Sequence, residues 1–271
     1  MKNLICRTLT GIVYVAVIVA AILFGTLSFA AVFAVFTGLL VGECLRLIQY
    51  KGSIWGKISG IAGGMYFFVA TALFKGDYVG KIIFLPYIML LLIIIVSTLY
   101  YKKGNPLDQL GKYLFVQIYC VGGLSALNGV SYSLTPEYSP LPVLMLFIFI
   151  WLNDTGAFII GSWLGKRRLF QSISPKKSWE GFFGGCFITV SAAVAMSFYI
   201  PDYNMIEWII FAIITVIAAT FGDLFESLVK RTFHAKDSGN ILPGHGGFLD
   251  RFDSVILAAP TVYVLFEIFG F

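Results

Sequence analysis

Long apolar runs recur along the whole chain, and short polar segments separate them. The runs are continuous, as in helices that cross a bilayer, and lack the alternation of membrane-barrel strands. A helix needs roughly 17 to 25 mostly apolar residues to cross the hydrocarbon core. The pattern therefore predicts an all-α fold, a polytopic transmembrane helix bundle of nine spans. The predicted spans are 9–24, 29–45, 58–74, 82–99, 113–130, 141–163, 179–200, 206–229 and 252–269.

The composition supports lipid as the surrounding solvent. Hydrophobic residues make up 59% of the chain and charged residues 12%, whereas roughly 25% of residues are charged in soluble domains. The spans leave no room for a separate soluble domain, so we expect one integral membrane unit. The first span follows Lys2 and Arg7 like a signal peptide, but no small-residue cleavage site follows it, and we expect it to be retained.

The basic residues predict the orientation. With the N-terminus in the cytoplasm, 17 of the 19 Lys and Arg residues fall in the N-terminal segment and in alternate connections, and only Lys75 and Lys81 fall on the other side. Cytoplasmic connections of membrane proteins carry this excess of positive charge. The net charge of +5 is therefore read as a topology signal and an attraction to anionic lipid, and not as a nucleic-acid-binding feature.

Polar residues are distributed unevenly. Residues 1–140 carry few ionisable groups within their spans and are expected to form a lipid-facing scaffold, whereas residues 141–271 contain the two longest cytoplasmic connections, 165–178 and 230–251. Catalytic loops are expected there. Small residues line several spans, which favours close helix packing and is compatible with a homodimer. The four cysteines are scattered and suit packing better than a metal or redox site.

Acidic residues inside membrane spans are costly and need a partner or a purpose. Glu43 precedes Arg46 by three positions, so an interfacial ion pair between them and a functional role remain equal alternatives. Asp154 lies within the sixth span beside Asn153 and Thr155. Water would reach Asp154 only through a polar cavity.

Two further acids are candidate metal ligands. Helical spacing places Asp223, Glu226, Ser227 and Lys230 on one face at the end of the eighth span, and Asp250 stands near the start of the ninth. Consecutive antiparallel helices would bring Asp223 and Asp250 to similar depth, and facing carboxylates of this kind suit Mg²⁺. The alternative is that Asp250 caps the last helix and pairs with the neighbouring arginine.

Both long connections contain features that bind phosphate. Residues 244–247 include three glycines, which allow backbone amides to approach an anion closely. In the connection 165–178, Ser174 and Pro175 predict a helix start, and with Lys176 and Lys177 this start would form an anion site. Positive-inside bias alone explains Arg167 and Arg168. His245 has no assigned role, because a structural hydrogen bond and acid–base work are both open.

These residues together resemble a known family. The segment 227–253, the triplet Asn153–Asp154–Thr155 and the stretch 174–181 resemble the signature of the phosphatidate cytidylyltransferases, also called CDP-diglyceride synthases. The similarity covers about the last 120 residues strongly, and the first 140 only in hydropathy. Phe158 departs from the pattern, since many relatives carry Tyr there. The matching positions of segment 227–253 are Ser227, Leu228, Val229, Lys230, Arg231, Lys236, Asp237, Gly239, Leu242, Pro243, His245, Gly246, Gly247, Asp250, Arg251 and Asp253.

The resemblance implies an enzyme that converts CTP and phosphatidate into CDP-diacylglycerol and pyrophosphate with Mg²⁺ and room for a second cation. It implies a bacterial-type inner membrane, with the active site on the cytoplasmic side. Asp223 and Asp250 are the expected metal ligands. The expected catalytic residues are Asp154, Asp223, Lys230, Arg231 and Asp250, and the expected substrate-binding residues are Lys176, Lys177, Ser227, Lys236, Asp237, His245, Gly246, Gly247 and Arg251.

Two other functions compete with this one. A CTP-dependent polyprenol or phytol kinase would transfer the terminal phosphate of CTP to an alcohol and would need a base. An ion-coupled transporter would use the membrane acids as a cation path, but the chain lacks the internal repeats of many transporters, and its acids lie near one surface.

Overall fold

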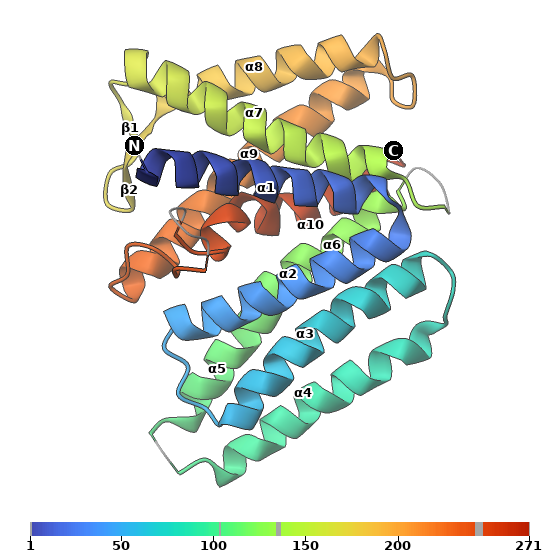
Figure 1. The fold of residues 1–271 in the computed structure, drawn as a ribbon, viewed down its shortest axis with the longest axis vertical. Helices are drawn as coiled ribbons and strands as arrows, with labels where there is room; N and C mark the ends of the chain where they lie inside the picture. The colour runs from blue at the N-terminus through green and yellow to red at the C-terminus, as the bar shows by residue number, and fades with distance from the viewer. Residues whose placement is uncertain (1, 103, 134–136, 242–245, 271) are drawn as a thin grey trace.

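The computed structural model describes residues 2–102, 104–133, 137–241 and 246–270, with side chains from Thr8 onward. Helices dominate the described part of the chain, where one short hairpin interrupts them (Figure 1). The α-helices are α1 Lys2–Leu23, α2 Thr26–Leu47, α3 Ile54–Lys75, α4 Leu85–Ser97, α5 Pro106–Val116, α6 Gly123–Ser131, α7 Pro140–Leu164, α8 Trp179–Ser197, α9 Met205–Thr232 and α10 Asp253–Phe269. The shorter elements are η1 Lys81–Phe84, η2 Thr98–Tyr100, η3 Gln117–Gly122, η4 Leu249–Arg251, β1 Arg168–Phe170 and β2 Ser174–Ser178.

The predicted all-α bundle is confirmed. Each of the nine predicted spans corresponds to a helical segment of the described chain, with η1, α4 and η2 together forming the fourth. Among the described residues, seven segments are long and apolar enough to cross a membrane, and the part of α1 from Thr8 to Leu23 is a shorter apolar helix. Helix α10 has 17 residues. The chain is therefore an integral membrane protein.

The fifth span is not one regular helix. A π-helical turn, η3, separates α5 from α6, and such turns within helices often reposition side chains. Gln117 at its start is buried, and its amide accepts a hydrogen bond from the Tyr87 hydroxyl at 3.0 Å and donates one to the Gly60 carbonyl at 3.4 Å. The interruption therefore satisfies a buried polar group with partners from two other helices.

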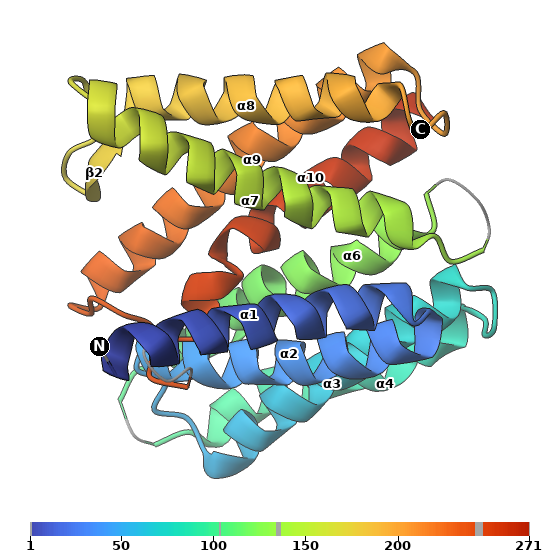
Figure 2. The same cartoon turned by 45° about the horizontal axis from the view of Figure 1, so that its top comes forward.

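The connections divide between the two ends of the bundle (Figures 1 and 2). The N-terminus, the hairpin and the α2–α3, α4–α5 and α9–α10 connections lie at one end, and the C-terminus lies at the other. This is the arrangement that the alternating basic connections require. The cytoplasmic orientation of the basic end stays a prediction.

The last four spans position the site. Helix α7 packs along α8, α8 along α9, and α9 along α10, while α10 also packs against α6. Helix α9 begins with a capping box, in which the Asn204 side chain accepts from the Glu207 amide and the Glu207 side chain accepts from the Asn204 amide. Its other end carries the polar face predicted from the sequence.

Candidate active site

The connection between α7 and α8 folds into a small antiparallel hairpin, which pairs Arg168 with Ser178 and Phe170 with Ser174. The predicted helix start at Ser174 and Pro175 is wrong, because both residues lie in strand β2. The helix begins at Trp179, where the Ser178 hydroxyl accepts a hydrogen bond from the Gly181 amide at 3.1 Å. A serine cap therefore exists, but four residues later than expected.

Glu180 fixes the base of this hairpin. Its carboxylate accepts hydrogen bonds from the backbone amides of Lys166 at 3.1 Å and Arg167 at 3.2 Å. The Trp179 amide donates to the Arg167 carbonyl at 2.9 Å. These bonds tie the start of the hairpin to the first turn of α8, so the two strands leave the helix ends in a defined direction.

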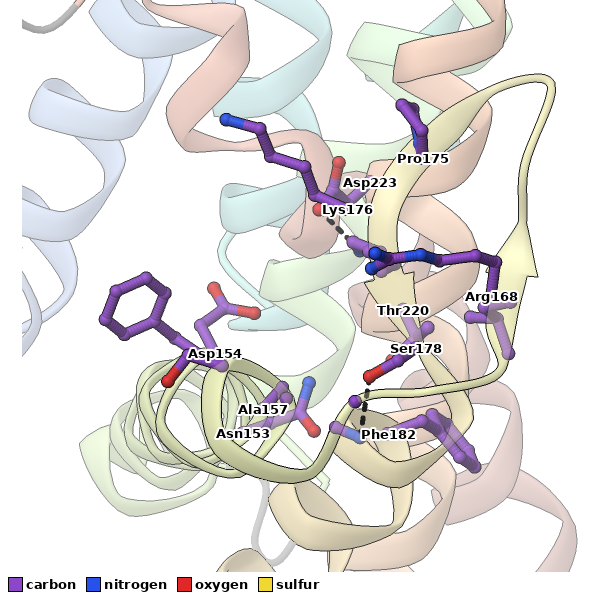
Figure 3. A pocket seen from close by; sticks show the side chains of 17 residues that line it. Asn153, Asp154, Ala157, Arg168, Pro175, Lys176, Ser178, Phe182, Thr220 and Asp223 are labelled. Atoms are coloured by element: carbon purple, nitrogen blue, oxygen red, sulfur yellow. Dashed lines mark hydrogen bonds and ion pairs between the residues drawn. The ribbon is translucent and has the colours of Figure 1, made fainter.

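A cavity of about 580 Å³ opens between α7, the hairpin, α8 and α9. Figure 3 shows side chains from all four elements around it. Asp154 of α7 is among the lining residues and is exposed there. Arg168, Lys176 and Asp223 line the same cavity, and apolar groups such as Phe182 complete its wall.

An ion pair crosses the cavity from the hairpin to α9. The Lys177 Nζ lies 2.5 Å from the Asp223 Oδ2, and each side chain is about 30% exposed. Lys176 and Arg168 are both exposed and line the cavity beside this pair. The site thus places three cationic side chains next to two carboxylates, Asp223 and Asp154. Such a set can bind a phosphate chain together with a cation.

A group of three carboxylates lies where α9 meets α10. Ligand oxygens of Asp223, Glu226 and Asp253 all lie within 4.8 Å of one another. Gly222 allows the close approach, because a Cβ on it would stand 2.6 Å from the Asp253 carbonyl oxygen. Three oxygen donors at this spacing fit a hard divalent cation such as Mg²⁺.

Asp250 lies in a different setting from the one expected. It belongs to η4, one turn before α10, and therefore does not cap that helix. Its carboxylate lies 2.7 Å from the Lys230 Nζ and accepts from the amides of Ser238 at 3.1 Å and Gly247 at 2.9 Å. Burial alone would raise the pKa of Asp250, but the hydrogen bond and charge of Lys230, together with hydrogen bonds from Glu226 and the Ser238 amide, lower the pKa. Asp250 is thus an ionised anchor for the loop.

The structure groups Asp223 with Glu226 and Asp253 rather than with Asp250. The two sets are linked, because the Lys230 Nζ lies 2.5 Å from Glu226 Oε2 as well as 2.7 Å from Asp250. The predicted polar face of α9 is confirmed by this contact. Metal binding by Asp250 stays a prediction.

The remaining predicted residues surround the loop. Ser227 is buried, and its hydroxyl donates to Asp223 Oδ1 at 3.4 Å. Gly246 has a left-handed backbone with φ of 82°, which favours glycine. Arg231, Lys236, Asp237 and Arg251 are exposed and do not belong to the cavity lining that the described residues form. His245 lies outside the described residues.

Sequence reasoning missed Arg168 and Glu180. Arg168 was attributed to topology alone, yet it lines the cavity. Glu180 had no assigned role, although an acid in the first turn of a predicted helix is a known signal. Its two backbone partners precede it by 13 and 14 positions, so the hairpin had to be known before its role could be seen.

Comparisons with known proteins identify relatives across the whole chain. The sequence profile of the Cytidylyltransferase family matches residues 5–269. A protein of Bacillus subtilis named phosphatidate cytidylyltransferase is 32% identical over 269 residues, which cover 97% of this chain and 98% of that protein. Proteins of the same name from Staphylococcus aureus and Staphylococcus haemolyticus are 47% and 45% identical over 126 residues, about 45% of this chain and 48% of each relative.

Proposed function

The chain belongs to the cytidylyltransferase family, and we infer that it is a phosphatidate cytidylyltransferase, which converts CTP and phosphatidate into CDP-diacylglycerol and pyrophosphate. One structural observation supports this function most. A cavity at the ends of membrane helices combines three cationic side chains with the carboxylates of Asp154 and Asp223. Such a place suits a nucleotide that must meet a lipid phosphate.

The chemistry places modest demands on the protein. An oxygen of the lipid phosphate attacks the α-phosphorus of CTP in line, a new P–O bond forms, and the bond to the β-phosphate oxygen breaks. The electron pair of that bond leaves with pyrophosphate. Because a phosphate monoester is already largely ionised at neutral pH, no protein nucleophile or strong base is needed. Alignment and charge stabilisation carry the catalysis.

The cationic residues of the hairpin suit the nucleotide. Lys176 and Arg168 line the cavity and are exposed, so we assign them to the phosphates of CTP. Lys177 is positioned by Asp223 and lies at the junction between these cations and the acids. It would neutralise charge on the oxygens around the α-phosphorus, where the negative charge is crowded during attack.

A divalent cation fits the acidic residues of the site. Asp223, Glu226 and Asp253 present oxygen donors close to one another. Lys230 links Asp250 to this group, because its Nζ contacts both Glu226 and Asp250. We propose that Asp223 holds Mg²⁺ with partners from this set, including Asp250 as the sequence predicts. When bound, the cation would neutralise phosphate charge. Lys230 contacts both Glu226 and Asp250 and sets the spacing between them, whether or not Asp250 binds the cation.

Labelled CTP tests the function. We expect the purified protein in detergent, given phosphatidate and Mg²⁺, to transfer the label from [α-³²P]CTP into lipid and to release pyrophosphate. Label from [γ-³²P]CTP should remain in pyrophosphate. Transfer of the γ-label into a lipid alcohol, with none of the α-label, would instead identify a kinase and contradict the proposal. Ion transport in liposomes without turnover of CTP would also contradict it.

We further propose that the site faces the cytoplasm, where CTP is made, in a bacterial-type inner membrane. The basic residues support this orientation, because the hairpin and the α9–α10 connection both lie at the end of the bundle that carries most of them.

A further inference from the structure

Glu43 lies far from the C-terminal site in sequence but contacts its loop directly. The side chain stands on α2 and is fully buried. Its Oε2 accepts a hydrogen bond from the Leu249 amide at 2.6 Å, across 206 positions of sequence. Leu249 directly precedes Asp250. The carboxylate therefore binds the backbone immediately beside the loop anchor.

The alternative partner of Glu43 is not used. Arg46 is exposed, and its Nε donates to the Gly42 carbonyl at 3.4 Å. Among the residues that the structure describes, no ion pair joins Arg46 to Glu43. The interfacial pair considered from the sequence is therefore not formed, and the acid faces the loop.

Two glycines of the α9–α10 loop, Gly239 and Gly247, allow its backbone to pack closely against Glu43. A Cβ on Gly239 would stand within 1.9 Å of Glu43 Oε1, and a Cβ on Gly247 within 2.7 Å of the same oxygen. Asp250 accepts from the Gly247 amide and from the Ser238 amide, which adjoins Gly239. Asp250 thus binds the backbone on both sides of the loop, at Ser238 and Gly247, and Glu43 binds it at Leu249 and packs closely against Gly239 and Gly247.

Apolar contacts align α2 with the same segment. The Phe36 ring lies 5.0 Å from the Phe248 ring and 5.4 Å from the Phe252 ring, measured between centroids. Phe36 precedes Glu43 by seven positions, which places both on one face of the helix. This face of α2 therefore packs on the loop through aromatic rings and reaches its backbone with one carboxylate.

We propose that Glu43 is a positioning residue for the cytidylyl transfer: as a hydrogen-bond acceptor it fixes residues 247–250 and so holds Asp250 at Lys230. A buried carboxylate without a cationic partner costs free energy, which an apolar residue would avoid. The kinetic consequence rests on the function proposed above. The contact between Glu43 and the loop does not depend on that function, and it can be measured separately.

Three variants test the proposal kinetically. Glu43→Leu removes the acceptor and should lower kcat at least about tenfold, since small misplacements of reacting groups are costly. Glu43→Gln keeps an acceptor oxygen and should stay within about threefold of the parent. Arg46→Ala, one turn along the same helix, is the matched control and should leave kcat unchanged. Glu43→Leu with parental kcat, or Arg46→Ala with the defect of Glu43→Leu, would overturn it.

Hydrogen exchange in detergent tests the contact without turnover. In Glu43→Leu the amides of segment 246–252 should exchange faster, while α9 and the middle of α10 keep their protection. If Glu43→Leu does not fold, Gly239→Ala provides the second variant, because its new Cβ would push the loop from Glu43 and should accelerate the same amides. Unchanged exchange in the folded variants would overturn the proposal even if the enzyme catalysed another reaction.

Discussion

Lys177 ties the hairpin to the acidic end of α9 through an ion pair. Its ammonium lies 2.5 Å from Asp223, and it stands beside the exposed Lys176 in a cavity large enough for a nucleotide phosphate chain. A partly exposed ion pair contributes little to stability. The position of Lys177 therefore has more effect on what the cavity binds than on how tightly the protein folds.

We predict that Lys177→Ala lowers kcat/KM for CTP roughly ten- to hundredfold, because a charge-assisted contact is worth about 1.5 to 3 kcal/mol. Lys176→Ala should also lower kcat/KM for CTP. The control is Arg167→Ala, on the same connection but outside the cavity lining. Steady-state rates with varied CTP decide the matter. If all three variants matched the parent, the two lysines would serve topology alone.

Asp223 and Asp250 should respond differently to the loss of charge. Asp223→Asn should abolish turnover and the rise of melting temperature with Mg²⁺. Without Mg²⁺ it should be as stable as the parent, because it relieves repulsion among three crowded carboxylates. Asp250→Asn should also lose turnover, but its carboxylate holds Lys230 and two amides, so it should melt several degrees lower without Mg²⁺.

Melting curves in detergent with and without Mg²⁺, beside CDP-diacylglycerol formation, check both variants. Asp108→Asn on α5 is the control, since Asp108 pairs with Lys112 away from the site. A parental Mg²⁺ response in Asp223→Asn would remove this residue from the metal site. Full activity in Asp250→Asn would exclude Asp250 as a metal ligand.

At the scale of single residues, the sequence predicted acidic residues whose charge is costly within a membrane span. Asp154 and Asp223 were found because charge within a membrane span needs a reason. Lys177 was found through the expected helix start at Ser174, which is a strand, and the cavity brings the three residues together. Glu180 and the partner of Glu43 were not found. Their hydrogen bonds depend on a hairpin and on a loop contact 206 positions away, which no local pattern contains.

Among the elements, the pair α9 and α10 determines how closely the acids approach. Both helices carry carboxylates at their facing ends, and Gly222 leaves room for the backbone of α10. The nine spans themselves were predictable, because lipid permits few alternatives to long apolar helices. The hairpin was not, since Ser174 and Pro175 carry a local helix-start signal that the pairing of β1 with β2 overrides.

Gly222→Ala should therefore separate α9 from α10. The new Cβ would stand 2.6 Å from the Asp253 carbonyl oxygen, a backbone atom that cannot move alone. Overpacking of this kind costs about 1 to 3 kcal/mol, and we expect a lower melting temperature together with weaker stabilisation by Mg²⁺. The change adjoins Asp223, so turnover should fall as well.

Gly111→Ala is the matched control for this substitution. It lies within α5, where a Cβ would meet no atom within 4 Å, and alanine favours a helix by roughly 1 kcal/mol over glycine. This variant should be as stable as the parent or more stable. If Gly222→Ala behaved like Gly111→Ala, the helices would not be in tight contact at the acids.

For the molecule as a whole, the placement of the connections at two ends of the bundle determines access to the site. The hairpin and the α9–α10 loop lie at the same end, with the N-terminus (Figure 1). The hairpin lines the cavity, so we expect a water-soluble nucleotide to enter from that end and the lipid substrate to come from the bilayer. The orientation of the bundle is therefore a condition for function.

We predict that the hairpin end faces the cytoplasm, because 17 of 19 basic residues belong to that end. Ser172 and Asp202 are both exposed and lie in the connections at opposite ends of α8, so they form a matched pair of labelling sites in a chain whose native cysteines are replaced. A membrane-impermeant maleimide added to intact cells should modify Asp202→Cys and spare Ser172→Cys, and inside-out vesicles should reverse the pattern. Ser133→Cys, near the α6–α7 connection, should behave like Asp202→Cys. Because α8 crosses the bundle between the paired positions, labelling of Ser172→Cys from outside would invert every connection at once and would separate the cavity from cytoplasmic CTP.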